Sequence, residues 1–241
     1  MKKTIIFLLL LLPLTVFCSD NDTAKISSDS IKTNKMELGM SFSPDFCFRK
    51  LKPAADSKWI ADIRDTLEVP KFGYTVGANF TFKVNNKIDL ETGVFFSDSG
   101  EKTKKYSLVD VPSGQKAIKY SCNFHDYYLN IPVKVNYYFL IHKLNFYLTA
   151  GISANIFVYQ KTTLITSYGN SDSKTTSKST PGFSRVNIAV LAGFGIKYPV
   201  TNKINLKIEP LYMHSATSII KAPIKTYFYS LGVNVGICQK F

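Results

Sequence analysis

The chain has 241 residues, which is enough for one domain of moderate size with loops and leaves little for a second domain. Lysine and arginine number 30 against 17 aspartates and glutamates, and the formal net charge is +13. The basic residues are spread over several segments, whereas a nucleic-acid-binding protein concentrates them on one element beside aromatic partners. We therefore expect no nucleic acid among the partners, and an anionic lipid surface suits this distribution better.

The N-terminus has the features of a secretory signal peptide. Lys2 and Lys3 form a basic start, and the apolar run over residues 4–17 is too short to span a bilayer. We predict cleavage after Cys18, which would remove residues 1–18 from the mature protein. No later segment has 18 uninterrupted apolar residues, so the sequence predicts no helical membrane span.

A lipoprotein with Cys18 as the acylated residue is the alternative to simple cleavage. Phe17 argues against it, because so bulky a side chain is unusual directly before a lipid-bearing cysteine. The following residues 19–35 are rich in Ser, Asp, Asn, Thr and Lys and predict a flexible periplasmic lead-in. The folded domain is then expected over residues 36–241.

The clearest pattern runs from Leu144 to Tyr159, where apolar residues occupy every second position. A period of two is typical of a β-strand with one apolar and one polar face. Soluble strands usually have about 5–6 residues, whereas a tilted membrane-spanning strand needs about 9–11. The pattern therefore predicts an all-β fold, an eight-stranded antiparallel up-and-down transmembrane β-barrel. The expected strands are Met36–Phe48, Phe72–Val84, Ile88–Thr103, Phe124–Leu140, Leu144–Tyr159, Arg185–Val200, Ile204–Ser215 and Thr226–Phe241.

Connections of two lengths alternate between these strands. The tight turns fall at residues 85–87, 141–143 and 201–203. The long connections fall near residues 49–71, 104–123, 160–184 and 216–225. Such alternation is typical of barrels in the bacterial outer membrane, with the long loops outside the cell and both termini in the periplasm. The Ser-, Thr- and Lys-rich segment 167–180 is expected to be a mobile loop tip.

The polar positions of the strands, which would face the lumen, hold glycines and charges. An eight-stranded barrel is barely wide enough inside for side chains, so glycines there make room for bulky neighbours. The charged residues in these positions are Glu37, Lys83, Asp89, Glu91, Lys134, Arg185, Lys197, Lys207 and Glu209. Buried charges persist only when they are paired, so we expect a network of ion pairs that plugs the lumen. A proton or ion relay is the functional alternative, and a filled lumen argues against a transport pore.

The apolar positions carry two groups of aromatic residues. The group near the long loops comprises Phe46, Phe48, Phe72, Tyr74, Phe96, Tyr127, Tyr212, Tyr227 and Tyr229. The group near the tight turns comprises Phe82, Tyr137, Phe139, Phe146, Tyr198 and Phe241. Two aromatic belts around an aliphatic band are typical of a transmembrane barrel. A soluble lipocalin-like barrel is the alternative fold, and it would turn its apolar face inward.

Two segments resemble a known family. Residues 93–102, Gly-Val-Phe-Phe-Ser-Asp-Ser-Gly-Glu-Lys, resemble the third-strand motif of the PorT-like outer-membrane β-barrel family of Bacteroidetes. Residues 128–139, Tyr-Leu-Asn-Ile-Pro-Val-Lys-Val-Asn-Tyr-Tyr-Phe, resemble its fourth-strand motif, although Asn130 and Asn136 depart from it. By strand order the resemblance extends over residues 36–241. The namesake is associated with type IX protein secretion, but most relatives have no assigned role, so the resemblance implies the barrel and not that role.

The C-terminal strand resembles the assembly signal of outer-membrane barrels. Its apolar residues on one face are Val233, Val235, Ile237 and Phe241. Gln239 departs from the pattern, because an aromatic or aliphatic residue is usual at that place. The resemblance implies that the barrel-insertion machinery is a partner of this chain.

Three cysteines remain after the expected cleavage, an odd number for an oxidising compartment. Cys47 and Cys122 both fall near the loop ends of predicted strands, whereas Cys238 lies near the turns. A disulfide between Cys47 and Cys122 is one interpretation. Free, buried thiols are the other, because the two strands are not neighbours and a disulfide needs closely spaced Cα atoms.

The sequence shows no catalytic, cofactor-binding or metal-ligating motif. His214 is the strongest candidate for chemistry, because barrel enzymes that trim lipid A place a histidine and a serine on the lipid face at this depth. The hydroxyl would be needed at Ala216, and Ser215 points to the other side of the strand. His125 is expected at the membrane interface and His142 in a turn.

We therefore expect a non-enzymatic outer-membrane barrel whose extracellular loops serve interaction, envelope stability or a secretion machine. A barrel enzyme acting on lipid A or phospholipid is the alternative function. The expected partners are outer-membrane lipid and lipopolysaccharide, the barrel-insertion machinery, and a protein partner that the sequence does not identify.

Overall fold

The computed structural model of the protein describes residues 35–107, 118–141, 143–168, 171–180 and 182–241. The predicted signal peptide over residues 1–18 lies outside the described residues, as does the lead-in except for Lys35. His142, which we expected in a turn, is likewise outside them.

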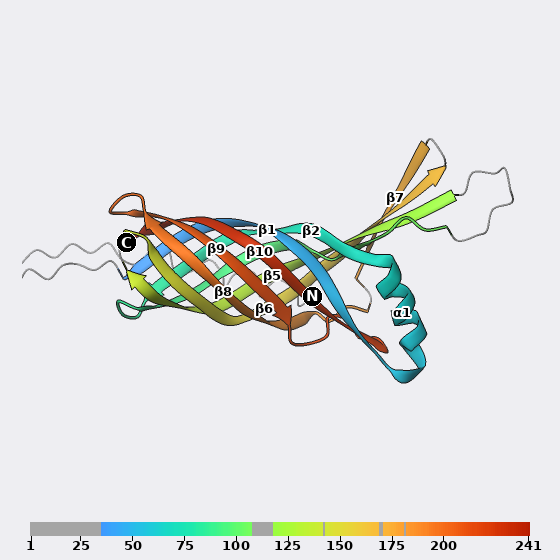
Figure 1. The fold of residues 1–241 in the computed structure, drawn as a ribbon, viewed down its shortest axis with the longest axis horizontal. Coiled ribbons are helices and arrows are strands. Elements are labelled where there is room, and N and C mark those ends of the chain that lie inside the picture. Colours follow the sequence, from blue (N-terminus) through green and yellow to red (C-terminus); the bar gives the residue numbers. More distant parts are fainter. Residues whose placement is uncertain (1–34, 108–117, 142, 169–170, 181) are drawn as a thin grey trace, which may run out of the picture. The chain divides into compact units, whose positions relative to one another are not determined.

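The described residues form one antiparallel sheet of ten labelled strands, together with two short helices (Figure 1). The strands are β1 (Met36–Pro53), β2 (Glu68–Lys83), β3 (Ile88–Ser99), β4 (Glu101–Thr103), β5 (Ile118–Ile141), β6 (Asn145–Tyr168), β7 (Ser171–Ser179), β8 (Val186–Pro199), β9 (Ile204–Ser215) and β10 (Ile224–Lys240). The helices are η1 (Ala55–Ser57), a 3-10 helix, and α1 (Lys58–Leu67). Neither helix is long and apolar enough to cross a membrane.

The sheet closes into a barrel because β1 pairs with β10 on one side and with β2 on the other. The ten strands occupy eight positions in this ring. β4 continues β3 beyond Gly100, whose φ of 123° is a conformation that side-chain-bearing residues rarely adopt. β7 and β8 follow one another along β6, with β7 paired to residues 160–168 and β8 to residues 145–156. The predicted eight-stranded antiparallel barrel is confirmed.

The barrel turns its apolar face outward. Along β1, Leu38, Met40 and Phe42 are exposed, whereas Glu37 and Ser41 at the alternate positions are buried. This arrangement is the reverse of a soluble barrel and excludes the lipocalin-like alternative. We call the end with the tight turns the turn end and the opposite end, which carries α1, the loop end.

The two predicted aromatic belts are confirmed as rings of outward-facing side chains at the two ends of the apolar band. Phe72 at the loop end is 78% exposed and Phe241 at the turn end is 62% exposed. Rings of neighbouring strands contact one another, as in the pairs Phe46–Phe72 and Phe139–Phe146, whose centroids are 5.5 and 6.3 Å apart. The strand segments between the belts are the membrane-spanning part of the barrel.

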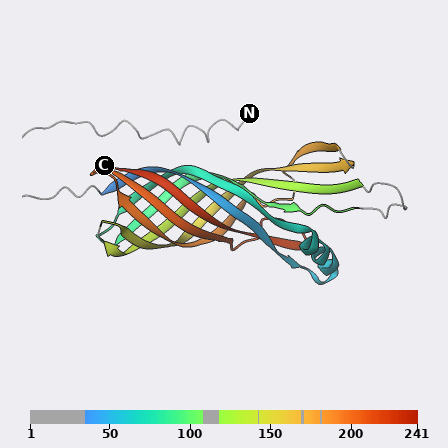
Figure 2. The ribbon, with the colours of Figure 1, turned by 45° about the horizontal axis from the view of Figure 1, so that its top comes forward.

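The strands extend well beyond the loop-end belt, where long loops were predicted. β5 and β6 have 24 residues each, and β7 pairs with β6 across the segment expected to be a mobile loop tip. Figure 2 shows the ends of β5, β6 and β7 projecting from the barrel. The sequence predicted loops over residues 160–184 and 104–123. That prediction was wrong for residues 118–123, 160–168 and 171–179, which belong to strands. Apolar alternation marks only strand segments in contact with lipid, whereas backbone pairing continues with polar side chains.

The segment 49–71 was also predicted to be a loop, and it holds the end of β1, both helices and the start of β2. The turns at residues 85–87 and 201–203 are confirmed, because strand pairing stops at both places and resumes directly after them. The expectation that glycines make room in the lumen is confirmed at Gly195. A Cβ atom there would lie 2.2 Å from the ring of Tyr147 on the neighbouring strand.

Candidate functional site: the closed lumen and the loop-end rim

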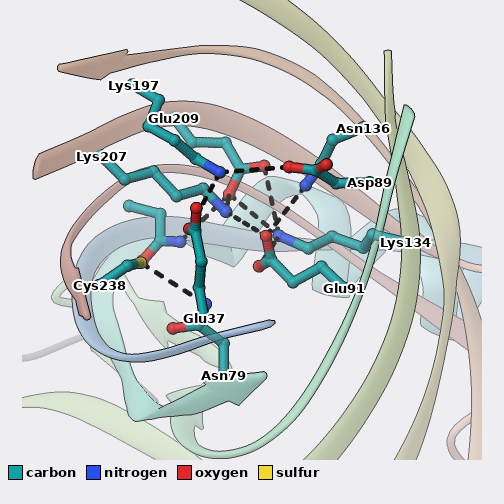
Figure 3. Close-up of polar contacts among 11 residues, drawn as sticks. Glu37, Asn79, Asp89, Glu91, Lys134, Asn136, Lys197, Lys207, Glu209 and Cys238 are labelled. Carbon is teal, nitrogen blue, oxygen red and sulfur yellow. Dashed lines mark hydrogen bonds and ion pairs between the residues drawn. The ribbon is translucent and has the colours of Figure 1, made fainter. Parts of the chain in front are cut away.

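Four charged residues form a ring of alternating sign in the lumen, which we call the central network: Glu91, Lys134, Lys207 and Glu209. The ammonium of Lys134 lies 2.9 Å from a carboxylate oxygen of Glu91 and 3.0 Å from one of Glu209. Lys207 lies 2.6 and 3.1 Å from the same two carboxylates (Figure 3). All four side chains are buried, so each charge depends on its partners for compensation.

A second group, the basal network, lies toward the turn end and consists of Glu37, Asp89 and Lys197. The Lys197 ammonium lies 3.1 Å from Glu37 and 3.2 Å from Asp89. Asn205 donates a hydrogen bond of 3.1 Å to the second oxygen of Glu37. With two acids and one base, this network has one negative charge in excess. Lys83 lies beside it and lines a cavity of about 80 Å³ shared with Lys197.

Neutral groups complete the coordination of these charges. Asn136 donates to Glu91 over 3.0 Å, and Asn234 donates to Glu209 over 3.2 Å. The ammonium of Lys207 also lies 5.7 Å from the ring centroid of the fully buried Tyr147, within the range of a cation–π contact. The side chains therefore fill the centre of the barrel with polar groups. The charges are paired, but the hydroxyl of Tyr147 and Oδ1 of Asn136 have no hydrogen-bond partner among the described residues.

Seven of the nine charged residues predicted to line the lumen thus join the two networks. Lys83 faces the turn-end cavity and has no ion pair with a described residue. Arg185 is a correction, because its side chain is exposed and forms no ion pair with a described residue, so it does not join the buried networks. Its backbone precedes the first residue of β8, Val186, so the alternation of that strand does not orient it.

The lumen is closed at the loop end by an apolar layer that the sequence did not predict. Tyr128 and Phe228 from the wall pack with Ile219, which comes from the connection between β9 and β10. Phe157 packs against this layer and stacks on Phe183 at a centroid distance of 4.2 Å. The signal in the sequence was the pair of isoleucines at residues 219–220, the only large apolar residues in this connection.

A cavity of about 70 Å³ lies between the central network and this layer. Its wall combines apolar side chains such as Phe95 and Leu211 with the carboxylate of Asp45. Ser43 donates a hydrogen bond of 2.6 Å to Asp45. The space suffices for a few water molecules, because one water needs roughly 10–15 Å³ of such volume.

Outside the loop-end belt, a second set of ion pairs, the rim cluster, ties α1 to the barrel. Arg49 of β1 is buried and contacts both Asp65 of α1 and Glu68 at the start of β2. Arg64 of α1 lies 2.6 Å from Glu68 and 3.6 Å from Glu101 of β4. Three strands and the helix are therefore joined by one group of charges.

Glu101 is the most perturbed acid of the rim cluster. Burial, together with the nearby carboxylates of Asp126 and Glu68, raises the pKa of Glu101 to about 8. One of its carboxylate oxygens has no hydrogen-bond partner among the described residues. The side chain therefore binds a proton near neutral pH, which lowers the repulsion among the three acids.

A smaller group joins three strands beside the rim cluster, with Asp98 between Lys71 and His125. Asp98 lies 2.7 Å from the Lys71 ammonium and 2.7 Å from Nδ1 of His125. The same nitrogen of His125 lies 2.9 Å from Lys71. His125 thus contacts a charged pair and is not only the interfacial residue that we expected. No hydroxyl of the described residues is hydrogen-bonded to its ring.

The other candidate for chemistry, His214, lies on the outward face, where its ring stacks on Tyr212 at 6.3 Å. Ser215 faces inward, is buried, and donates to Asn187 over 3.5 Å. The two side chains are therefore on opposite faces of β9, as the sequence predicted. Across the described ranges, no group of three or more His, Cys, Asp or Glu residues is placed to hold a metal ion.

All three described cysteines are free thiols. Cys47 and Cys238 are buried, and Cys122 is half-buried. The Cys47–Cys122 disulfide is therefore not formed in this structure, in agreement with the alternative of free thiols. The two buried thiols, those of Cys47 and Cys238, face inward. The side-chain amide of Asn79 donates a hydrogen bond of 3.9 Å to the sulfur of Cys238.

The residues of the expected assembly signal lie on the outward face of β10. Val233, Val235, Ile237 and Phe241 are all exposed there. The backbone N–H of Phe241 donates to the carbonyl of Met36 over 2.9 Å, so the last residue still belongs to the closure between the first and last strands.

The fold is similar to solved outer-membrane proteins. Neisserial surface protein A matches at 17% identity and a TM-score of 0.41, covering 86% of this chain and 97% of that one. OprG from Pseudomonas aeruginosa matches at 14% identity and a TM-score of 0.48, covering 86% and 96%. The outer membrane protease OmpT from Escherichia coli matches at 11% identity and a TM-score of 0.42, covering 87% and 98%. No curated protein matches the chain.

The family described as outer membrane protein beta-barrel domain matches residues 37–221. This range runs from the first lumenal acid of β1 to the connection before β10 and includes both ion networks. A closed antiparallel barrel with an apolar outer face and two aromatic belts is the structure that a bilayer requires of such a chain. The protein therefore belongs to this family of outer-membrane β-barrels.

Proposed function

We propose that this protein is a non-enzymatic, non-conducting outer-membrane barrel that acts by interaction through its loop end, outside the cell. The observation that carries the proposal is the closed lumen. The basal network, the central network and the apolar layer follow one another along the barrel, and each is formed by buried side chains. A path for solutes would have to break several buried ion pairs, each of which is strongly destabilising to disrupt.

The loop end offers a defined surface for a partner. α1 turns the buried Ala61 toward the barrel and presents Trp59 and Ile63 on the opposite side, with Ile60 exposed between the two faces. Trp59 is 63% exposed and Ile63 is 50% exposed. An apolar helix face held in place by the ion pairs of Arg49 is the kind of rigid surface that protein partners use.

An envelope or secretion-machinery role is one form that this interaction could take, but the resemblance to PorT-like proteins supports only the barrel and does not transfer that role. The first motif segment, residues 93–102, runs from β3 into β4, and the second, residues 128–139, lies in β5, which neighbours both strands in the barrel. Asn130, at a place where that family more often has Glu, donates to Ser97 of the other motif over 2.9 Å. In this chain the two motifs therefore hold neighbouring strands together. We expect the protein to bind a partner through a different part of the structure, the loop end.

Site-specific crosslinking tests the proposal. A photoreactive phenylalanine analogue at Trp59 should give a discrete crosslinked protein in intact cells, and one at Lys203, in a turn-end connection, should not give the same product. Trp59→Ala combined with Ile63→Ala should abolish co-purification of that protein while the barrel remains folded. A steady ohmic conductance of the purified protein in planar bilayers would contradict the proposal.

The enzyme alternative is tested separately. If the barrel modified lipid A or phospholipid, His214→Ala or His125→Ala would change the lipid composition of the outer membrane. We expect the lipid profiles of both variant strains to match that of the wild type, because no hydroxyl group of the described residues is hydrogen-bonded to either ring.

A further inference from the structure

Two lysines face each other across neighbouring strands just outside the loop-end aromatic belt. Lys161 of β6 and Lys178 of β7 are direct partners in the antiparallel register. Side chains opposed in this way have Cβ atoms only about 4.5–5.5 Å apart, and like charges there destabilise strand pairing. The pairing of β6 with β7 therefore includes a repulsive contact.

Neither lysine is compensated within the described part of the chain. Lys161 and Lys178 form no ion pair with a carboxylate there, whereas Lys134, Lys197 and Lys207 in the lumen each contact two. Among the described residues, His125 is the only other one in the same row across the sheet with a titratable side chain, and its Nδ1 is already engaged by Asp98. The row thus presents uncompensated positive charge.

Aromatic rings lie directly beneath this charge. Tyr159 precedes Lys161 by two residues on the same face of β6, and its ring contacts that of Tyr127 at 4.6 Å. The ammonium of Lys178 lies 5.0 Å from the centroid of the Tyr159 ring. Tyr127 belongs to the loop-end belt, so the backbones of Lys161 and Lys178 lie only about 5 Å beyond the belt, which is the rise of two residues along a tilted strand.

We propose that Lys161 and Lys178 together bind a phosphate group of outer-leaflet lipopolysaccharide, with the Tyr159 ring against the adjoining sugar and acyl region. A phosphate between the two ammonium groups replaces their repulsion by two charge-assisted hydrogen bonds. We assign the phosphate to a lipid because of the position of the two lysines. They lie on the outward face of the wall just beyond the belt, at the depth of the lipid phosphates. The proposal does not depend on the interaction proposed for α1.

Native mass spectrometry of the detergent-extracted barrel tests the site with purified lipid A. The wild type should retain phosphorylated lipid A at least about tenfold better than its dephosphorylated form, since two charged contacts are at stake. Lys161→Gln combined with Lys178→Gln should lose this preference. The matched control, Lys87→Gln combined with Lys203→Gln, removes the same charge at the turn end and should keep it.

Hydrogen exchange separates binding from a structural role of the lysines. Without lipid, Lys178→Gln should slow amide exchange in β6 and β7, because it removes the repulsion. With phosphorylated lipid A the order should reverse, and the wild type should exchange more slowly than the variant. Equal retention of both lipid forms by the wild type, or displacement of lipid A by an equal concentration of inorganic phosphate, would overturn the proposal. A variant that exchanges faster than the wild type in both conditions would overturn it as well.

Discussion

At the scale of single residues, the lumen is organised by pairing between charges that are distant in sequence. Glu91 contacts its direct cross-strand partner Lys134, but it also contacts Lys207, which is 116 residues away and lies across the barrel. Glu209 binds the same two lysines. Each lysine thus has two acids, and the loss of one acid leaves two buried cations with a single carboxylate.

The first prediction is that Glu209→Gln costs about 3 kcal/mol of stability, because it leaves Lys134 and Lys207 undercompensated. Lys207→Met alone should cost a similar amount. The double variant should cost clearly less than the sum, since it removes one charge of each sign. Urea unfolding in lipid vesicles measures all three free energies. Additive costs would show that the two side chains do not interact.

At the scale of elements, α1 is positioned by charges from its neighbours. A helix of 10 residues is marginal by itself in water, so its order depends on contacts with the rest of the protein. Arg49 of β1 and Glu101 of β4 supply these contacts through Asp65, Glu68 and Arg64. The rim cluster is therefore the place where pH should act on the structure.

The second prediction concerns this pH dependence. The folded-state pKa of Glu101, about 8, lies above the reference value of 4.5, so the folded rim binds a proton that the unfolded chain releases between these values. Its contribution to stability is complete below about pH 4.5 and is lost as the pH rises through about 8. Amide exchange in α1 and β4 should accelerate accordingly from pH 5 to pH 9, after correction for the intrinsic rate.

Glu101→Gln should flatten this dependence, because the amide stays neutral at every pH. The control Asp56→Asn changes an exposed acid of η1 and should leave the dependence as in the wild type. A slope that persists unchanged in Glu101→Gln would assign the effect to other groups.

At the scale of the whole molecule, closure of the sheet allows the barrel to span the bilayer. Pairing of β1 with β10 closes the ring, so the sheet has no open edge within the membrane. The loop end and the turn end must then lie on opposite sides of the bilayer. Their different construction, long polar strands with a helix against tight turns, fits an extracellular and a periplasmic side respectively.

The third prediction tests this orientation in intact cells that carry Cys122→Ser as background, because Cys47 and Cys238 are buried. A membrane-impermeant maleimide should label Ser173→Cys on β7. It should not label Lys203→Cys in a turn until the cells are broken. The reverse labelling would invert the topology.

The fourth prediction separates assembly from stability. Deletion of Phe241 removes one belt side chain and one backbone hydrogen bond, to Met36, from a closed ring, so the refolded barrel in detergent should lose little stability. Recognition by the insertion machinery should suffer far more, and the variant should accumulate in the periplasm or be degraded. Wild-type surface levels of the deletion variant would show that Phe241 is not required for assembly.

The sequence alone determined which residues face lipid and which face the lumen. Alternation with a period of two is a local property, and lipid contact imposes it on every strand, so the eight positions of the ring and most lumenal charges could be predicted. The alternation rule fails at Arg185. This residue lies just before β8, so the strand does not fix the direction of its side chain. Beyond the membrane, water accepts polar residues on either face, and the pattern that marked the strands disappears.

Only the tertiary structure decided which groups meet. Glu91 and Lys207 are joined because closure of the ring brings β3 and β9 across a narrow lumen, and no spacing in the chain encodes that distance. Ile219 became part of the apolar layer because its connection folds back into the barrel mouth. The opposed pair Lys161 and Lys178 depends on the register of β7 on β6, which is fixed by backbone hydrogen bonds and not by side-chain pattern.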